Sequence, residues 1–97
     1  MNLTAGPADP SARIEAIEGA VAVLASSRAI SAGLANSLSA KLGAAGNRVH
    51  AQPPAAVGIL GAFIRQVAAL VQAGKLDLTE GTNLTAAAQS VITQLTD

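Results

Sequence analysis

The side chains most able to do chemistry in this 97-residue chain are few and far apart. His50 is the only histidine, and the chain has no cysteine. A metal site needs three or four ligands, and no acidic residue lies close to His50 in the sequence. Pro53-Pro54 follow shortly after it, as is typical of a loop. We therefore predict that His50 is a solvated loop residue and that the chain holds no metal and no other cofactor.

Glu15 and Glu18 are the best candidates for a pair of catalytic carboxylates. They are three residues apart and would share one face of a helix. A glycosidase, however, needs its two carboxylates on either side of a cleft with aromatic or polar walls. Phe63 is the only aromatic residue, so we interpret this pair as solvated helix surface. We predict that the chain has no catalytic residues and is not an enzyme.

Two further patterns have a functional and a structural interpretation. Gly58 and Gly61 are not followed by the lysine and serine of a phosphate-binding loop, but they could let another helix approach closely. Asn2-Leu3-Thr4 and Asn83-Leu84-Thr85 match the glycosylation sequon, and we interpret both as chance matches.

The charge balance excludes several classes of partner. Six basic and six acidic residues give a net charge of zero, without the basic face that nucleic acid requires and without a polybasic stretch for anionic lipid. The most apolar stretch, residues 55–73, is interrupted by Arg65 and Gln66, which favours a buried helix over a membrane span. Residues 1–7 lack the basic and apolar regions of a signal peptide.

Alanine, the best helix former, supplies much of the hydrophobic half of the chain and indicates an all-α fold. Residues 1–8 read as a linker or an added N-terminus, and residues 9–97 as a single helical domain. The first helix begins at Asp9-Pro10, with Ser11 as an alternative cap, and runs to about Ala25. Its apolar stripe, at steps of three, four and three, consists of Ile14, Ile17, Val21 and Leu24.

The second helix begins at the cap Ser31 and ends at Gly46-Asn47, where we expect a positive φ. Residues 46–52 then form a loop, because proline disfavours helix in the residue before it. The apolar residues of the second helix repeat every four positions: Leu34, Leu38 and Leu42.

The third helix is predicted from about Pro54 to Gln72 and ends before Gly74. Because its apolar residues cover a wide arc, we expect it to be the most buried helix, with Phe63 in the core. The fourth helix is predicted to begin at the cap Thr79 and to end near Leu95, with Asp77 and Glu80 favouring its dipole. Its apolar stripe consists of Leu84, Ala88, Val91 and Leu95.

A shift of forty-six residues superimposes apolar positions of the first half of the chain on those of the second. Either the chain contains two related helical hairpins, or two amphipathic segments align by chance; Leu34 against Glu80 is a mismatch. With short connections, both alternatives predict a compact antiparallel four-helix bundle. The matching pairs are Ile14 and Leu60, Ile17 and Phe63, Val21 and Val67, Leu24 and Leu70, Ile30 and Leu76, and Leu38 and Leu84.

Four short runs resemble those of the FIMAH-type helical domain, over roughly Ile14 to Leu95. The residues after Asn47 depart from that family's direct entry into its third helix, which leaves the shape of the second loop open. The matching runs are GLANSLSAKL at 33–42 against GLxNSLxxKL, Gly46-Asn47 against its GN loop, AFIRQV at 62–67 against AFIxxV, and Leu78-Thr79 against the LT that opens its last helix.

The resemblance implies an accessory domain at the end of a large extracellular or cell-surface bacterial protein, often a hydrolase, and it brings no catalytic or ligand residues with it. We therefore expect a non-catalytic structural or protein-interaction module. Its partners would be other domains of the parent protein or a second copy of itself. The alternative is a carbohydrate-binding module that assists a secreted hydrolase, although sugar faces are usually held by aromatic rings.

Overall fold

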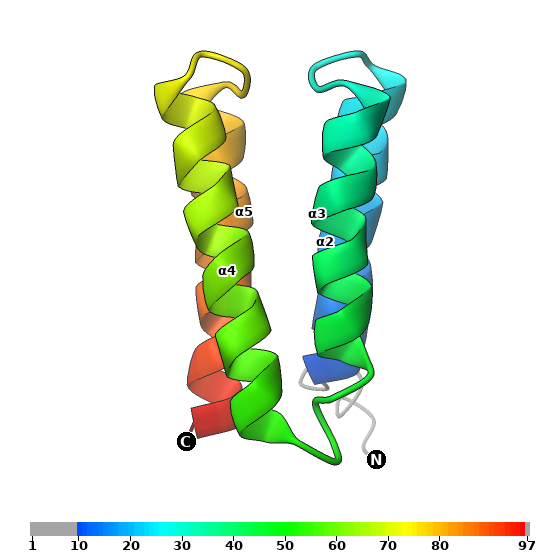
Figure 1. Cartoon of the computed structure of the whole chain (residues 1–97), viewed down its shortest axis with the longest axis vertical. Coiled ribbons are helices and arrows are strands. Elements are labelled where there is room, and N and C mark those ends of the chain that lie inside the picture. Colours follow the sequence, from blue (N-terminus) through cyan, green and yellow to red (C-terminus); the bar gives the residue numbers. More distant parts are fainter. Residues whose placement is uncertain (1–9, 97) are drawn as a thin grey trace, which may run out of the picture.

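The computed structural model describes residues 10–96, which form four α-helices running alternately up and down (Figure 1). The predicted linker at 1–8 and the predicted cap Asp9 lie outside the described residues. The helices are α2 (Pro10–Ser26), α3 (Ala32–Gly46), α4 (Pro53–Gln72) and α5 (Leu78–Thr96).

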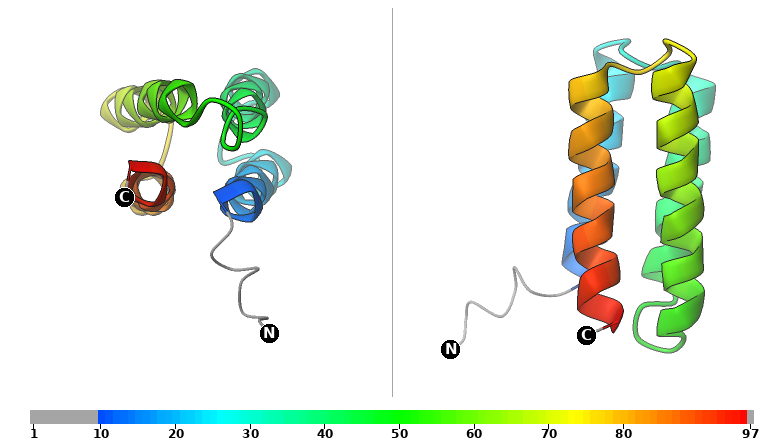
Figure 2. Two further views of the ribbon diagram at one scale, coloured as in Figure 1. Left: turned by 90° about the horizontal axis from the view of Figure 1, so that it is seen from below. Right: turned by 90° about the vertical axis from the view of Figure 1, so that its left-hand side faces the viewer.

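The four helices stand at the corners of a square when the bundle is viewed from its end (Figure 2, left). Each helix packs against two neighbours: α2 lies beside α3 and α5, and α4 lies beside α3 and α5. The diagonal pairs do not pack against each other. The predicted antiparallel four-helix bundle is confirmed.

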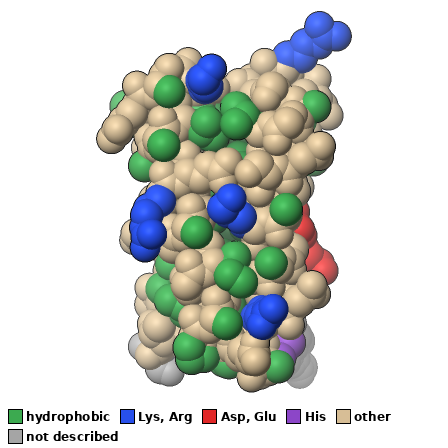
Figure 3. Space-filling view, viewed as in Figure 1, with side chains coloured by type: hydrophobic (Ala, Val, Ile, Leu, Met, Phe, Trp, Pro, Cys, Tyr) green, Lys and Arg blue, Asp and Glu red, His purple; other side chains and the backbone are tan. Residues whose placement is uncertain are grey.

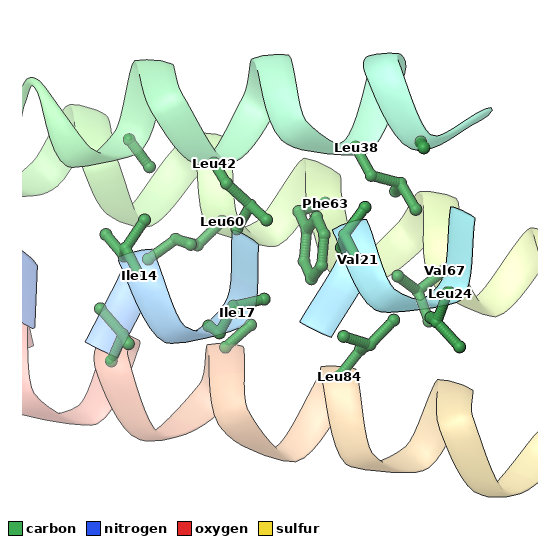
Figure 4. Packing of buried hydrophobic residues seen from close by; sticks show 14 of the residues in the cluster. Ile14, Ile17, Val21, Leu24, Leu38, Leu42, Leu60, Phe63, Val67 and Leu84 are labelled. Atoms are coloured by element: carbon green, nitrogen blue, oxygen red, sulfur yellow. The ribbon is translucent and has the colours of Figure 1, made fainter. Parts of the chain in front are cut away.

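The core lies along the axis of the bundle and consists of hydrophobic side chains from all four helices. Phe63 is 0 % exposed, as predicted, and Val21, Leu38 and Leu84 of the other helices lie around its ring (Figure 4). The loops add apolar residues at both ends, since Ile30, Val49 and Leu76 are buried although they lie outside the helices.

Of the two predicted helix caps, one is confirmed and the other is wrong. Ser31 caps α3 as predicted: its Oγ accepts a hydrogen bond from the Leu34 amide at 3.2 Å. The prediction that Thr79 caps the last helix is wrong, because α5 already begins at Leu78. Asp77 takes this role, and its Oδ2 accepts from the Thr79 amide at 3.1 Å.

The end of α3 also differs from the prediction. Asn47 has φ −71° and ψ −14°, and neither Gly46 nor Asn47 has a positive φ. The amide of Asn47 continues the helical pattern by donating to the Gly43 carbonyl at 3.1 Å. The loop needs no left-handed residue here, because a right-handed turn brings Val49 into the core.

The two hairpins, α2–α3 and α4–α5, are equivalent in detail when residues forty-six apart are compared. The last residues of α2 and α4, Ser26 and Gln72, are forty-six apart, and so are the first residues of α3 and α5, Ala32 and Leu78. All six apolar pairs predicted from the sequence are buried in both hairpins. The caps Ser31 and Asp77 also correspond.

The connecting loops have the same backbone conformation. Arg28 and Gly74 are equivalent and carry the positive φ angles of the described chain, 64° and 76°. The same backbone hydrogen bonds close both loops, namely Ser27 to Val23, Arg28 to Ala25 and Ala29 to Leu24 in the first, and Ala73 to Ala69, Gly74 to Val71 and Lys75 to Leu70 in the second. The bundle is therefore two copies of one supersecondary unit.

Candidate functional site

The residues singled out for chemistry lie on the surface and do not gather at one place. His50 is exposed in the α3–α4 loop. Glu15 and Glu18 lie beside each other on α2 and line a polar hollow of about 190 Å³ next to α3. Within residues 10–96, no three His, Asp or Glu side chains lie close enough together to hold a metal ion.

No polar or charged residue is fully buried among residues 10–96, although the Oε1 atoms of Gln66 and Gln94 are buried. A partly buried hydrogen bond joins α4 to α3: Gln66 Nε2 donates to Ser37 Oγ at 3.0 Å. Any function of the described part therefore has to be carried by its outer surface.

Charge is divided between opposite sides of the bundle. The charged residues of α3 and α4 are Lys41 and Arg65, and this face has basic side chains along its length and acidic ones only at its edge (Figure 3). The charged residues of α2 and α5 on the other side are Glu15, Glu18 and Glu80 together with Arg13, so that side is acidic in sum. The sequence alone did not predict this basic face. The net charge of the whole chain is zero, because basic residues on one side of the bundle are balanced by acidic residues on the other.

A groove of about 350 Å³ follows the boundary between α2 and α5. Its walls combine small residues with Arg13 and Glu80, which lie at opposite ends of the groove because α2 and α5 run antiparallel. The equivalent boundary between α3 and α4 is closed by the Gln66–Ser37 hydrogen bond, which has no counterpart here because the equivalent residues are Ala20 and Asn83.

The hollows at the boundary between α4 and α5 are lined by no charged residue, unlike those at the α2–α5 and α2–α3 boundaries. In the orientation of Figure 1, the upper part of this boundary, near the start of α5, is a groove of about 570 Å³. The lower part, near the start of α4, is a hollow of about 380 Å³. Leu78, 69 % exposed, lies at the upper end. The upper groove is walled by Ala68, Val71, Gln72, Leu78, Gly81, Thr82, Thr85, Ala86 and Gln89, and the lower hollow by Pro53, Pro54, Val57, Leu95 and Thr96.

The prediction that Gly58 and Gly61 let a neighbouring helix approach closely is wrong. A Cβ added at either position would meet no atom within 4 Å. The close approach is made instead by Gly81 of α5, where a Cβ would overlap the side chain of Val71 and lie 3.6 Å from Val67. Gly81 brings α5 against α4 and forms the floor of the uncharged groove.

As expected, α4 has more buried residues than any other helix, but its wide apolar arc is not fully covered. Five of its residues are buried, against four in each other helix, while Ile59, Ile64 and Val71 are only partly buried. α4 is the helix of the described chain that is long and apolar enough to cross a membrane, with a mean hydropathy of 1.7. Only 28 % of its most apolar window is buried, so this helix carries more apolar surface than the core uses.

Comparison with known proteins gives no relative: no family model, no curated protein and no solved structure matches the chain. The FIMAH resemblance therefore stays a prediction. The runs that carry it have structural positions, since Leu38, Leu42, Phe63 and Val67 are core residues.

Proposed function

We propose that this bundle is a non-catalytic accessory module of a larger extracellular bacterial protein and that it acts as a structural or protein-interaction domain. One observation carries the proposal. The polar chemistry of the described chain is dispersed over its surface, whereas the two hollows along α4 and α5 are lined by apolar and uncharged polar residues alone. Apolar surface gathered in this way is typical of a contact site for another protein.

The alternative, a carbohydrate-binding module, has less support. Aromatic rings that stack on sugar faces have to be exposed, and the only aromatic side chain, Phe63, is in the core at 0 % exposed. The extracellular setting rests on the FIMAH resemblance alone.

Deletion of the domain from its parent protein tests the proposal. Turnover on a small soluble substrate should be unchanged, because none of these residues touches the reacting atoms. A large loss of turnover in a truncated parent that is shown to be folded would overturn the accessory function. Titration of the isolated chain with a panel of soluble glycans tests the alternative, for which the proposal expects no saturable binding.

A further inference from the structure

The equivalence of the two hairpins provides an internal control for every surface position. Where the fold alone dictates a residue type, both hairpins should carry a similar residue, as they do at the buried pairs. Where only one hairpin carries an apolar residue on its surface, packing of the hairpin does not require it, except where the residue packs against a glycine, as Val71 does against Gly81.

The outer surface of α4–α5 differs from that of α2–α3 in this respect. Positions that are apolar or lack a side chain in the second hairpin are acidic, polar or small in the first. The α2–α3 hairpin packs into the same bundle without them. The pairs are Val57 and Ser11, Gly61 and Glu15, Ile64 and Glu18, Val71 and Ala25, Leu78 and Ala32, and Ile92 and Gly46.

These six residues of the second hairpin belong to one continuous face of the bundle, which is named here the α4–α5 face. In the view onto this side, the two helices lie next to each other along its full length (Figure 2, right). Ile64, Val71 and Ile92 are partly buried and Leu78 is exposed, so that each of the four presents apolar surface to the outside.

We propose that the α4–α5 face is the contact surface for a second copy of this chain, related by a twofold axis. This inference rests on the proposed function and deepens it, because it names the partner and the surface. In a twofold dimer the same patch meets itself, and a patch without charged residues needs no pairing of opposite charges across the axis. Neither groove of the α4–α5 face is lined by a charged residue, whereas the α2–α5 groove is lined by Arg13 and Glu80 and the α2–α3 hollow by Glu15 and Glu18.

The dimensions of the face agree with those of a dimer interface. The bundle measures 41 × 25 × 19 Å, so one side is 41 Å long and two helices wide. Its area is of the order of the ~800 Å² per partner that a standard specific interface buries. Two such faces brought together would form a second four-helix layer, in which helices pack as they do inside each bundle.

Sedimentation equilibrium of the 97-residue chain tests the proposal. The mass should approach twice the chain mass of 9.5 kDa with increasing concentration. Ile64→Glu introduces the residue that the first hairpin carries at the equivalent Glu18, and it should halve the mass to that of a monomer. Val23→Glu is the matched control, because Val23 is an apolar residue on α2 that is 66 % exposed and lies outside the face. It should leave the dimer intact.

Leu78→Glu keeps the test decisive if Ile64→Glu fails to fold, since Leu78 is 69 % exposed and contributes little to the core. It should also give a monomer with the helical circular dichroism of the parent chain. A monomer at every concentration overturns the proposal. So does a dimer that persists in a folded Ile64→Glu or Leu78→Glu variant, whether or not Val23→Glu disrupts it.

Distances between spin labels locate the interface directly. The chain has no cysteine, so Thr85→Cys places a single label on the α4–α5 face and Ser39→Cys places one at the equivalent position of the other hairpin. The distance between the two labels of a dimer should be shorter for Thr85→Cys than for Ser39→Cys, and the reverse order would overturn the proposal.

A chain that stays monomeric but sediments with phosphatidylcholine vesicles would overturn the proposal and assign the face to a membrane instead. If the unsubstituted chain forms no dimer while deletion of the domain leaves parent turnover unchanged, this inference is refuted and the proposed function stands.

Discussion

At the scale of single residues, the account depends on which side chains are buried and which cap a helix. Burial was predictable because apolar residues recur at steps of three and four, which fixes the core face of a helix. The caps were less predictable. Asp77 and Thr79 are both good capping residues two positions apart, and the structure selects Asp77 because the loop is closed by a left-handed Gly74 and anchored by buried Leu76.

Truncation of Phe63 should have the largest effect of any single core change. Phe63→Ala removes the one aromatic ring of a fully buried site, and we expect it to lower the free energy of unfolding by about 3–5 kcal/mol. Urea unfolding measures this directly. An unfolding curve that superimposes on that of the parent chain would contradict the central position of Phe63.

Substitution of the caps should distinguish Asp77 from Thr79. Asp77→Ala leaves the Thr79 amide without its partner and should cost about 1 kcal/mol, as should Ser31→Ala at the equivalent start of α3. Thr79→Ala is the matched control within the first turn of α5 and should cost much less. Thermal unfolding of the three variants checks this, and a greater loss for Thr79→Ala than for Asp77→Ala would return the cap to Thr79.

At the scale of elements, the contact between α4 and α5 is set by a glycine that the sequence pattern did not reveal. Gly58 and Gly61 lie three apart within one helix and invited the interpretation of a close crossing, but both face open space. Gly81 stands alone near the start of α5, and its importance depends on Val71, which is distant in sequence. Periodicity identifies the face of a helix, whereas the spacing between two helices depends on pairs of residues across their contact.

Substitution of Gly81 and of Gly58 by alanine should have opposite effects on the stability of the bundle. Gly81→Ala should destabilise the bundle by about 1–3 kcal/mol, because the added methyl group overlaps Val71, whose β-branched side chain is stiff in a helix. Gly58→Ala should stabilise it by about 0.5–1 kcal/mol through helix propensity alone. Chemical denaturation of both variants measures the difference. Stabilisation by Gly81→Ala would show that the two helices lie farther apart than described.

At the scale of the whole molecule, the fold could be predicted from the sequence but its surface could not. The forty-six-residue shift left open whether the hairpins are related or align by chance, and the inner helix ends, the loops and the caps agree with related hairpins. The division of charge between opposite sides, and the uncharged α4–α5 face, depend on which helices are neighbours. A sequence with a net charge of zero does not disclose that arrangement.

The central claim is that this domain acts by contact and takes no part in catalysis, and turnover by the intact and truncated parent protein tests it most directly. Both proteins are compared at equal concentrations of folded molecules on one small soluble substrate, with the isolated chain added back to the truncated parent in a third assay. The account predicts the same turnover in all three. A large fall on truncation, restored when the chain is added back, would contradict it by placing a residue of this bundle at the reacting centre.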